Sequence, residues 1–223
     1  MSFADWLADR TKTATRRLQP YFSRKGVSLL LIMVGVVLLG YVVGEYWGMY
    51  RSQRNLQAEW ERQTAALTTP SSTKLPAAAK MLARVVIPKI GMDAIVVEGD
   101  SRKALSEGPG HMPDTPPPGD PGNSVITAHR DTFFRHIYEL EKGDQIQVRR
   151  SGRTFTFAVT GKTIVMPENV GVIERTDDPR LTLITCYPTY YVGPAPKRLV
   201  VFSRLVETDG QPVKQAAQQH SGQ

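Results

Sequence analysis

A single cysteine, Cys186, ends the apolar run Leu181–Thr185, and a proline-rich loop separates it from a second alternating run, Lys197–Val206. Alternation of apolar and polar residues predicts that both runs are β-strands. If the two strands pair antiparallel, Arg198 at the start of the second lies beside Cys186 at the end of the first. Because the thiolate is the nucleophilic form of cysteine and a cation stabilises it, such a pair would form an activated nucleophile.

His129 is the candidate partner of that nucleophile. It follows a predicted buried strand, Asn123–Thr127, which comes directly after Gly108–Gly122, a stretch so rich in Gly and Pro that it must be a loop. A cysteine and a histidine without a metal point to acyl transfer. The thiol attacks a carbonyl, forms a thioacyl intermediate and passes the acyl group to water or to an amine. No CxxC, HExxH or GxGxxG motif is present, so neither a metal nor a cofactor is predicted.

Each of these three residues also has a purely structural explanation. A free cysteine is commonly a small buried apolar residue, a histidine commonly packs or caps, and an arginine at a strand end is commonly a solvated charge. Under that interpretation the chain would be a membrane-tethered binding module. Reaction of the folded protein with a thiol reagent would distinguish the two, because a core cysteine is inert.

The N-terminal region predicts a membrane anchor. The 223 residues carry a net charge of +7, but the excess is uneven, which argues against a nucleic-acid partner. Six basic residues precede the nineteen uncharged residues Gly26–Gly44. At about 1.5 Å per residue this run spans roughly the hydrocarbon core of a bilayer. It is too long for the apolar part of a signal peptide and lacks a small-x-small cleavage site, so a retained single-pass anchor in the cell membrane is expected.

The flanking charges and the local patterns predict the remaining organisation. The basic excess places the N-terminus in the cytoplasm and the folded domain outside, where a lone cysteine cannot form an intramolecular disulfide. Short alternating runs predict a mostly β barrel or sandwich, with short helices at Ser101–Glu107, capped by Ser101, and at Thr132–Leu140. The expected segments are a cytoplasmic tail (1–25), a transmembrane signal-anchor (26–47), a stalk and flexible linker (48–80), the folded domain (81–208) and a disordered tail (209–223).

Two segments resemble the sortase family: TLITC at 182–186, with Arg198 twelve residues on, and GHMPDTPPPGDPGNSVITAHRDTFFRHIYELEKGD at 110–144. The resemblance covers about Val85–Val206. It implies a mostly β fold, a closed eight-stranded sortase-type β-barrel with short helices, preceded by one N-terminal transmembrane helix. It also implies that Cys186 is the nucleophile, that His129 protonates the leaving amine and deprotonates the incoming one, and that Arg198 stabilises the oxyanion or holds the substrate backbone.

The resemblance further implies a substrate and a catalytic domain at 81–208. Sortases cleave an LPxTG-like C-terminal sorting signal after Thr and transfer the protein to an amine of the cell wall or of a surface protein. The loop TCYPTYYVGPAPKR looks most like class D, with Gram-negative-type sortases second. Thr185, Ala128 and His111 are expected to be substrate-binding residues, and no acidic cluster predicts a calcium site.

Two related activities are weighed against this one. A hydrolytic cysteine peptidase of the same fold would use the same acyl-enzyme with water as the acceptor, and the sequence leaves that alternative open. An L,D-transpeptidase is also β-rich and cysteine-dependent, but its signature has His and Gly immediately before the cysteine. Here Ile184 and Thr185 precede Cys186, which argues against that family.

Overall fold

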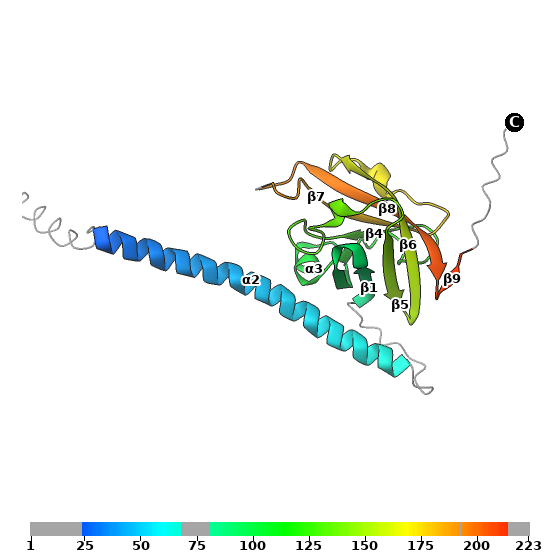
Figure 1. The fold of residues 1–223 in the computed structure, drawn as a ribbon, viewed down its shortest axis with the longest axis horizontal. Coiled ribbons are helices and arrows are strands. Elements are labelled where there is room, and N and C mark those ends of the chain that lie inside the picture. Colours follow the sequence, from blue (N-terminus) through cyan, green and yellow to red (C-terminus); the bar gives the residue numbers. More distant parts are fainter. Residues whose placement is uncertain (1–23, 68–80, 192, 214–223) are drawn as a thin grey trace, which may run out of the picture. The chain divides into compact units, whose positions relative to one another are not determined.

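The computed structural model describes residues 24–67, 81–191 and 193–213 (Figure 1). Contacts divide the chain into two compact units, Met1–Gly48 and Met49–Gln223. The predicted cytoplasmic tail lies almost entirely outside the described residues. The predicted linker at 68–80 and most of the predicted C-terminal tail also lie outside them.

Helix α2 (Arg24–Leu67) is 44 residues long and contains the predicted anchor. Its first half carries exposed Leu, Ile and Val side chains on every side, as expected of a helix made to contact lipid. Among the described residues it is the one helix long and apolar enough to cross a membrane. The uncharged run therefore forms the single helix that the sequence predicts.

The second half of α2 has a different surface. From Met49 onward, partly or fully buried side chains recur at intervals of three and four residues, the period of one helix face. These residues are Met49, Ser52, Gln53, Leu56, Gln57, Trp60 and Gln63. The segment 49–67 belongs to the same compact unit as the strands that follow. In this respect it differs from the predicted stalk, because one of its faces is packed.

Nine strands form one sheet whose first eight close into a barrel. They are β1 (Met81–Ile87), β2 (Met92–Glu98), β3 (Gly110–His111), β4 (Asn123–Thr127), β5 (Gln145–Arg150), β6 (Arg153–Val165), β7 (Arg180–Tyr187), β8 (Lys197–Thr208) and β9 (Gln211–Pro212). The order is β6-β5-β1-β2-β3-β4-β7-β8-β9, and a further pairing of β6 with β8 closes the ring. The predicted closed eight-stranded barrel is confirmed, with β9 as an additional short strand.

Short helical segments join the strands where local chemistry favours them. The 3₁₀ turn η1 (Pro88–Ile90) joins β1 to β2 and ends at Gly91, whose φ of 62° is a left-handed conformation that glycine adopts readily. Helix α3 (Arg102–Glu107) begins after Ser101, whose hydroxyl accepts a hydrogen bond from the Ala104 amide. This is the predicted N-cap.

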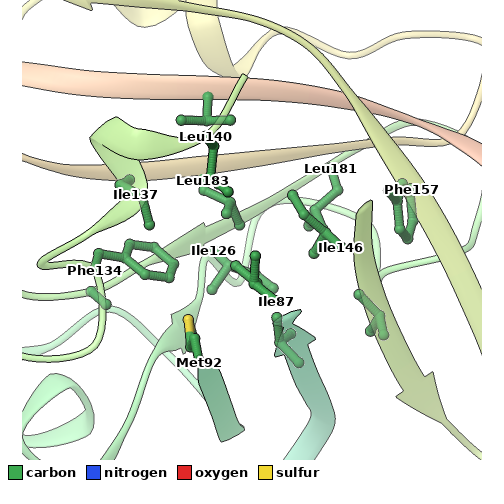
Figure 2. Close-up of a cluster of buried hydrophobic side chains, with 14 of the residues drawn as sticks. Ile87, Met92, Ile126, Phe134, Ile137, Leu140, Ile146, Phe157, Leu181 and Leu183 are labelled. Atoms are coloured by element: carbon green, nitrogen blue, oxygen red, sulfur yellow. The ribbon is translucent and has the colours of Figure 1, made fainter. Parts of the chain in front are cut away.

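Alternate residues of the strands fill the barrel (Figure 2). From β7 and β8 the core takes Leu181, Leu183, Leu199 and Val201, so the residues between them face outward. The segment between β4 and β5 also contributes Phe134, Ile137 and Leu140, all completely buried. The barrel interior is therefore a packed apolar core.

Two local predictions need correction. The segment Thr132–Leu140 is a series of turns ending in the 3₁₀ helix η2 (Ile137–Glu139), not an α-helix. Its buried residues recur every three positions, which matches the three-residue period of a 3₁₀ helix. The part of the C-terminal tail that the structure describes is ordered through residue 213, because β9 pairs with the end of β8.

Asp209 holds the turn between β8 and β9. Its carboxylate accepts hydrogen bonds from the Thr154 amide at 2.8 Å and from Arg153 Nε at 3.1 Å. The Thr154 amide and, after it, Arg153 lower the pKa of Asp209. Both contacts tie the end of β8 to the start of β6.

Candidate active site

The ends of β4, β7 and β8 meet at one part of the barrel. β7 and β8 pair antiparallel, and their register sets Cys186 directly opposite Arg198. Facing residues of an antiparallel pair project from the same side of the sheet. Their neighbours Thr185 and Leu199 are buried at 2 and 3 % exposure, so Cys186 and Arg198 project outward and are half-buried. The predicted juxtaposition of Cys186 and Arg198 on paired strands is present.

His129 reaches the same place from β4. The parallel register of β4 and β7 pairs Thr127 with Ile184, and two further residues along each strand bring His129 opposite Cys186. The pairing continues past the assigned strand, because the Ala128 amide donates to the Ile184 carbonyl at 3.3 Å. The His129 side chain is exposed. Sequence positions 129, 186 and 198 are thus brought together by three neighbouring strand ends.

The turn after β4 holds the backbone of His129. Its carbonyl accepts hydrogen bonds from the amides of Thr132, at 3.4 Å, and Phe134, at 3.2 Å. Because the Phe134 ring is completely buried in the barrel core, the turn is anchored from inside. The exposed imidazole is therefore carried by a backbone fixed on both sides.

The Arg198 guanidinium contacts its own loop. Nη1 donates to the carbonyl oxygens of Lys197 at 2.9 Å and Ala195 at 3.2 Å. No hydrogen bond joins it to Cys186 among the described residues. Its Cα position agrees with the sequence prediction, and its two loop contacts orient the start of β8.

The residues predicted to bind substrate occupy interior positions. The Thr185 hydroxyl donates to the Ala128 carbonyl at 2.7 Å, and both residues are buried. This bond fastens β7 to β4 one residue before Cys186 and His129. It suits a role in positioning those two residues. Direct binding of substrate by Thr185 and Ala128 stays a prediction.

His111 lies on β3 with 2 % exposure. Its Nδ1 faces the carboxylate of Glu98 at 3.1 Å, and its Nε2 faces the Pro116 carbonyl at 3.1 Å and the Thr115 hydroxyl at 3.2 Å. The Pro116 carbonyl can only accept and the Thr115 hydroxyl already donates to the Met112 carbonyl at 2.7 Å, so Nε2 is the donor in both contacts. These contacts fasten the proline-rich loop to β2 and β3. The predicted substrate contact of His111 stays untested.

An ion cluster at the surface orders the turn before β5. Lys89 Nζ lies 2.8 Å from the carboxylate of Asp144 and 2.9 Å from that of Glu141. Asp144, followed by Glu141, raises the pKa of Lys89. Lys89, followed by the Glu141 amide, lowers the pKa of Asp144. Within the described residues no group of His, Cys, Asp and Glu side chains is arranged to hold a metal ion.

Comparison with known proteins agrees with this geometry. A model of the sortase domain matches residues 85–206, the span of the resemblance in the sequence. The chain is 31 % identical over 196 residues to Sortase D of Bacillus subtilis, which covers 82 % of this chain and 99 % of that protein. This relative agrees with the resemblance to class D.

Solved structures show the same barrel. A Sortase D5 transpeptidase from Clostridium perfringens matches with a TM-score of 0.56 over 72 % of this chain and 99 % of that chain; at 22 % identity it shows the fold alone. Sortase E1 from Streptomyces coelicolor, solved with a tripeptide in the active site, matches at 27 % identity and a TM-score of 0.52, over 58 % of this chain and 90 % of that chain. The chain therefore belongs to the sortase family of cysteine transpeptidases.

Proposed function

We propose that Cys186, His129 and Arg198 are the catalytic residues of this sortase, and that its substrate is a protein ending in an LPxTG-like sorting signal. The observation that carries the assignment is the register of β4, β7 and β8. It brings His129, from a distant part of the chain, to a strand end adjacent to those that carry Cys186 and Arg198. All three are exposed or half-buried, so a peptide can reach them.

In the first half-reaction the Cys186 thiolate attacks the carbonyl carbon of the substrate Thr. A carbon–sulfur bond forms, and the carbonyl oxygen takes the electron pair as an oxyanion. When the tetrahedral intermediate collapses, the carbon–nitrogen bond to Gly breaks and protonated His129 gives its proton to the leaving amine. The product is a thioacyl enzyme and a released C-terminal peptide.

In the second half-reaction an amine attacks the thioester carbon and gives its proton to His129. The new carbon–nitrogen bond forms, the carbon–sulfur bond breaks and Cys186 returns as the thiolate. Arg198 stabilises the oxyanion of both tetrahedral intermediates or holds the substrate backbone. The fixed fork of donors in a guanidinium suits either role.

The acceptor is an amine of peptidoglycan or of a surface protein, and the enzyme acts outside the cytoplasmic membrane. The apolar half of α2 serves as the single anchor. The six basic residues before it favour an N-terminus in the cytoplasm and a catalytic domain on the other side. A peptide substrate is supported by the related Sortase E1, which was solved with a tripeptide in its active site.

Replacing Cys186 with Ala tests the assignment. The purified full-length chain is given a panel of peptides built on LPxTG, with and without an added amine. We expect an acyl-enzyme at Cys186, detected by mass, when no amine is present. With amine, the ligated product should dominate over the hydrolysed one. Cys186→Ala should lower kcat by at least about 10³-fold, because the nucleophile has no substitute.

A double variant tests whether His129 acts with Cys186. When residues act as one catalytic unit, the losses of activity caused by replacing each of them do not add. His129→Ala should therefore be about as severe as Cys186→Ala, and the double variant little worse than either. Additive losses would show that His129 acts elsewhere, and a Cys186→Ala protein that keeps a tenth of the activity would refute the nucleophile. Hydrolysis that persists unchanged with amine would indicate a peptidase.

A further inference from the structure

Arg130 follows His129 directly and contacts the loop that follows Cys186. Its Nη2 donates to the carbonyl oxygens of Tyr191 at 2.7 Å and Gly193 at 2.8 Å. The guanidinium carbon also lies 6.0 Å from the centre of the Tyr191 ring, within the range of a cation–π contact. These partners are 61 and 63 residues away in the sequence.

These contacts lie just past the point where the main-chain pairing of β4 and β7 ends. The last ties between these strands are the bond from Ala128 to Ile184 and the bond from the Thr185 hydroxyl to Ala128. His129 and Cys186 come next on each strand. The next hydrogen bonds between the segment after β4 and the loop after β7 come from the Arg130 side chain. The candidate catalytic pair therefore lies between the Thr185 bond on one side and the Arg130 bonds on the other.

The chemistry of the side chain suits this task. A guanidinium is always charged and presents its donors in one plane, so one nitrogen can hold two carbonyl oxygens in a fixed arrangement. A loop in which Tyr191 is exposed has little apolar burial of its own to hold it. Arg130 Nη1 is buried and has no hydrogen-bond partner among the described residues, so the two bonds of Nη2 are the side-chain hydrogen bonds that join Arg130 to the loop.

We propose that Arg130 is a positioning residue for transpeptidation: it fastens the loop after Cys186 to the segment that carries His129, and so sets the geometry between the two catalytic groups. The proposal rests on the proposed function of Cys186 and His129. The hydrogen bonds that Arg130 makes to the loop are an observation independent of that function.

Arg130→Met and Arg130→Lys test the proposal, with Arg135→Met as the matched control. Met keeps the apolar stem without the donors, whereas Lys keeps the charge on a flexible stem. Arg135 lies five residues further on, is exposed and makes no side-chain hydrogen bond to a described residue. Each full-length variant is assayed for kcat and KM on one peptide and for alkylation of Cys186 by iodoacetamide. Hydrogen exchange of the amides around Tyr191 and the melting temperature complete the comparison.

In Arg130→Met we expect faster exchange in the loop and a kcat lower by about 10²-fold, the loss that a misplacement of about 1 Å produces. KM should stay within about threefold and alkylation within about twofold, because a small reagent needs neither His129 nor the loop. Arg130→Lys should recover part of the kcat. Arg135→Met should match the wild type in every measurement.

Wild-type exchange and kcat in Arg130→Met would overturn the proposal while leaving Cys186 as the nucleophile. The proposal would also be overturned if Arg130→Met and Arg130→Lys lowered kcat by the same factor and lowered the melting temperature by the same amount. Arg130 would then be a structural residue only. If instead Cys186→Ala kept its activity, the proposed function would fail. The exchange measurement would still show whether Arg130 holds the loop.

Discussion

One nitrogen of the Arg198 guanidinium is hydrogen-bonded to the loop that precedes it. Nη1 donates to the carbonyls of Ala195 and Lys197, while no described residue accepts from Nε or Nη2. One arm of the fork is therefore anchored to the loop, and the other has no hydrogen-bond partner among the described residues. This arrangement favours directed hydrogen bonds to an oxyanion over a purely electrostatic role.

Arg198→Lys and Arg198→Ala separate these two roles. If Arg198 supplies directed hydrogen bonds, Lys should lose most of what Ala loses, because a point charge on a flexible stem copies neither the loop anchor nor the donor geometry. Losing one such donor typically costs about 10²–10³ in kcat. The measurement is kcat of both variants on one peptide.

Alkylation of Cys186 by a small reagent is the control for Arg198. It should change little in either variant if Arg198 acts on the substrate. A Lys variant within threefold of the wild type would refute the directed-donor role. Alkylation lost in both variants would show instead that Arg198 acts through the reactivity of the thiol.

Sequence reasoning reached some of these residues and missed others for identifiable reasons. The pairing of Cys186 with Arg198 follows from alternation, because two adjacent strands with a short connection form an antiparallel pair. The place of His129 depends on a parallel pairing between distant strands, which alternation does not specify, so the family resemblance was needed. Arg130 was missed because its partners are main-chain carbonyls, which any residue can supply.

At the scale of elements, the edge of β2 is closed by a side chain of α2. β3 is only two residues long and pairs with Val97 and Glu98, which leaves the main chain of Ile95 without a neighbouring strand on that side. The Gln53 side chain takes the place of a neighbouring strand. Its amide accepts from the Ile95 amide at 3.0 Å and donates to the Ile95 carbonyl at 3.2 Å, so both main-chain groups are paired.

The same glutamine also joins α3 to this edge. Its Nε2 donates to the carbonyl of Glu107 at 2.7 Å, at the end of α3. The next residue must be small, because a Cβ on Gly108 would clash with the Gln53 Nε2 and lie 2.7 Å from the Ile95 carbonyl oxygen. Asp93 on β2 raises the pKa of Arg84 on β1 through their hydrogen-bonded ion pair, and the charge of Glu61 on α2 is a smaller cause of the same shift.

Replacing Gln53 with Ala should therefore destabilise the folded domain. A buried donor or acceptor that loses its hydrogen-bond partner typically lowers the free energy of unfolding by about 1–3 kcal/mol. We expect a lower melting temperature of the full-length chain in detergent, with unfolding monitored by tryptophan fluorescence. The fluorescence of Trp60 on the same helix face should change in that transition.

Gln57→Ala is the matched control, since Gln57 lies one turn further along the same face and makes no side-chain hydrogen bond to a described residue. It should change stability by less than about 0.5 kcal/mol. If Gln53→Ala behaved like this control, the segment 49–67 would be the stalk that the sequence suggested. A buried glutamine among polar helix residues has no pattern of its own, which explains why the sequence did not predict this docking.

For the whole molecule, the arrangement of the strands was less accessible to sequence than their existence. Short apolar runs predict strands at Leu82–Ile87 and Ala94–Glu98, and alternating runs predict strands at Gln145–Val148 and Thr154–Met166. Each lies within a few residues of an observed strand. Closure depends on the pairing of β6 with β8, which have β7 and two long connections between them, and the register of that pairing shifts twice, once with an extra residue on each strand. The family resemblance predicted the barrel, whereas alternation alone left a barrel and a sandwich equally possible.

The charges that flank the apolar run predict the orientation of the chain in the membrane. The six basic residues before Gly26 should retain the N-terminus in the cytoplasm, because few positive charges follow the apolar run closely. In a Cys186→Ala background, a cysteine introduced at Ser71 should then react with an impermeant thiol reagent on intact spheroplasts. A cysteine introduced at Ser2 is the matched control and should react only after lysis. The opposite pattern at these two positions would place the catalytic domain in the cytoplasm, where a sorting signal on an exported protein could not be reached.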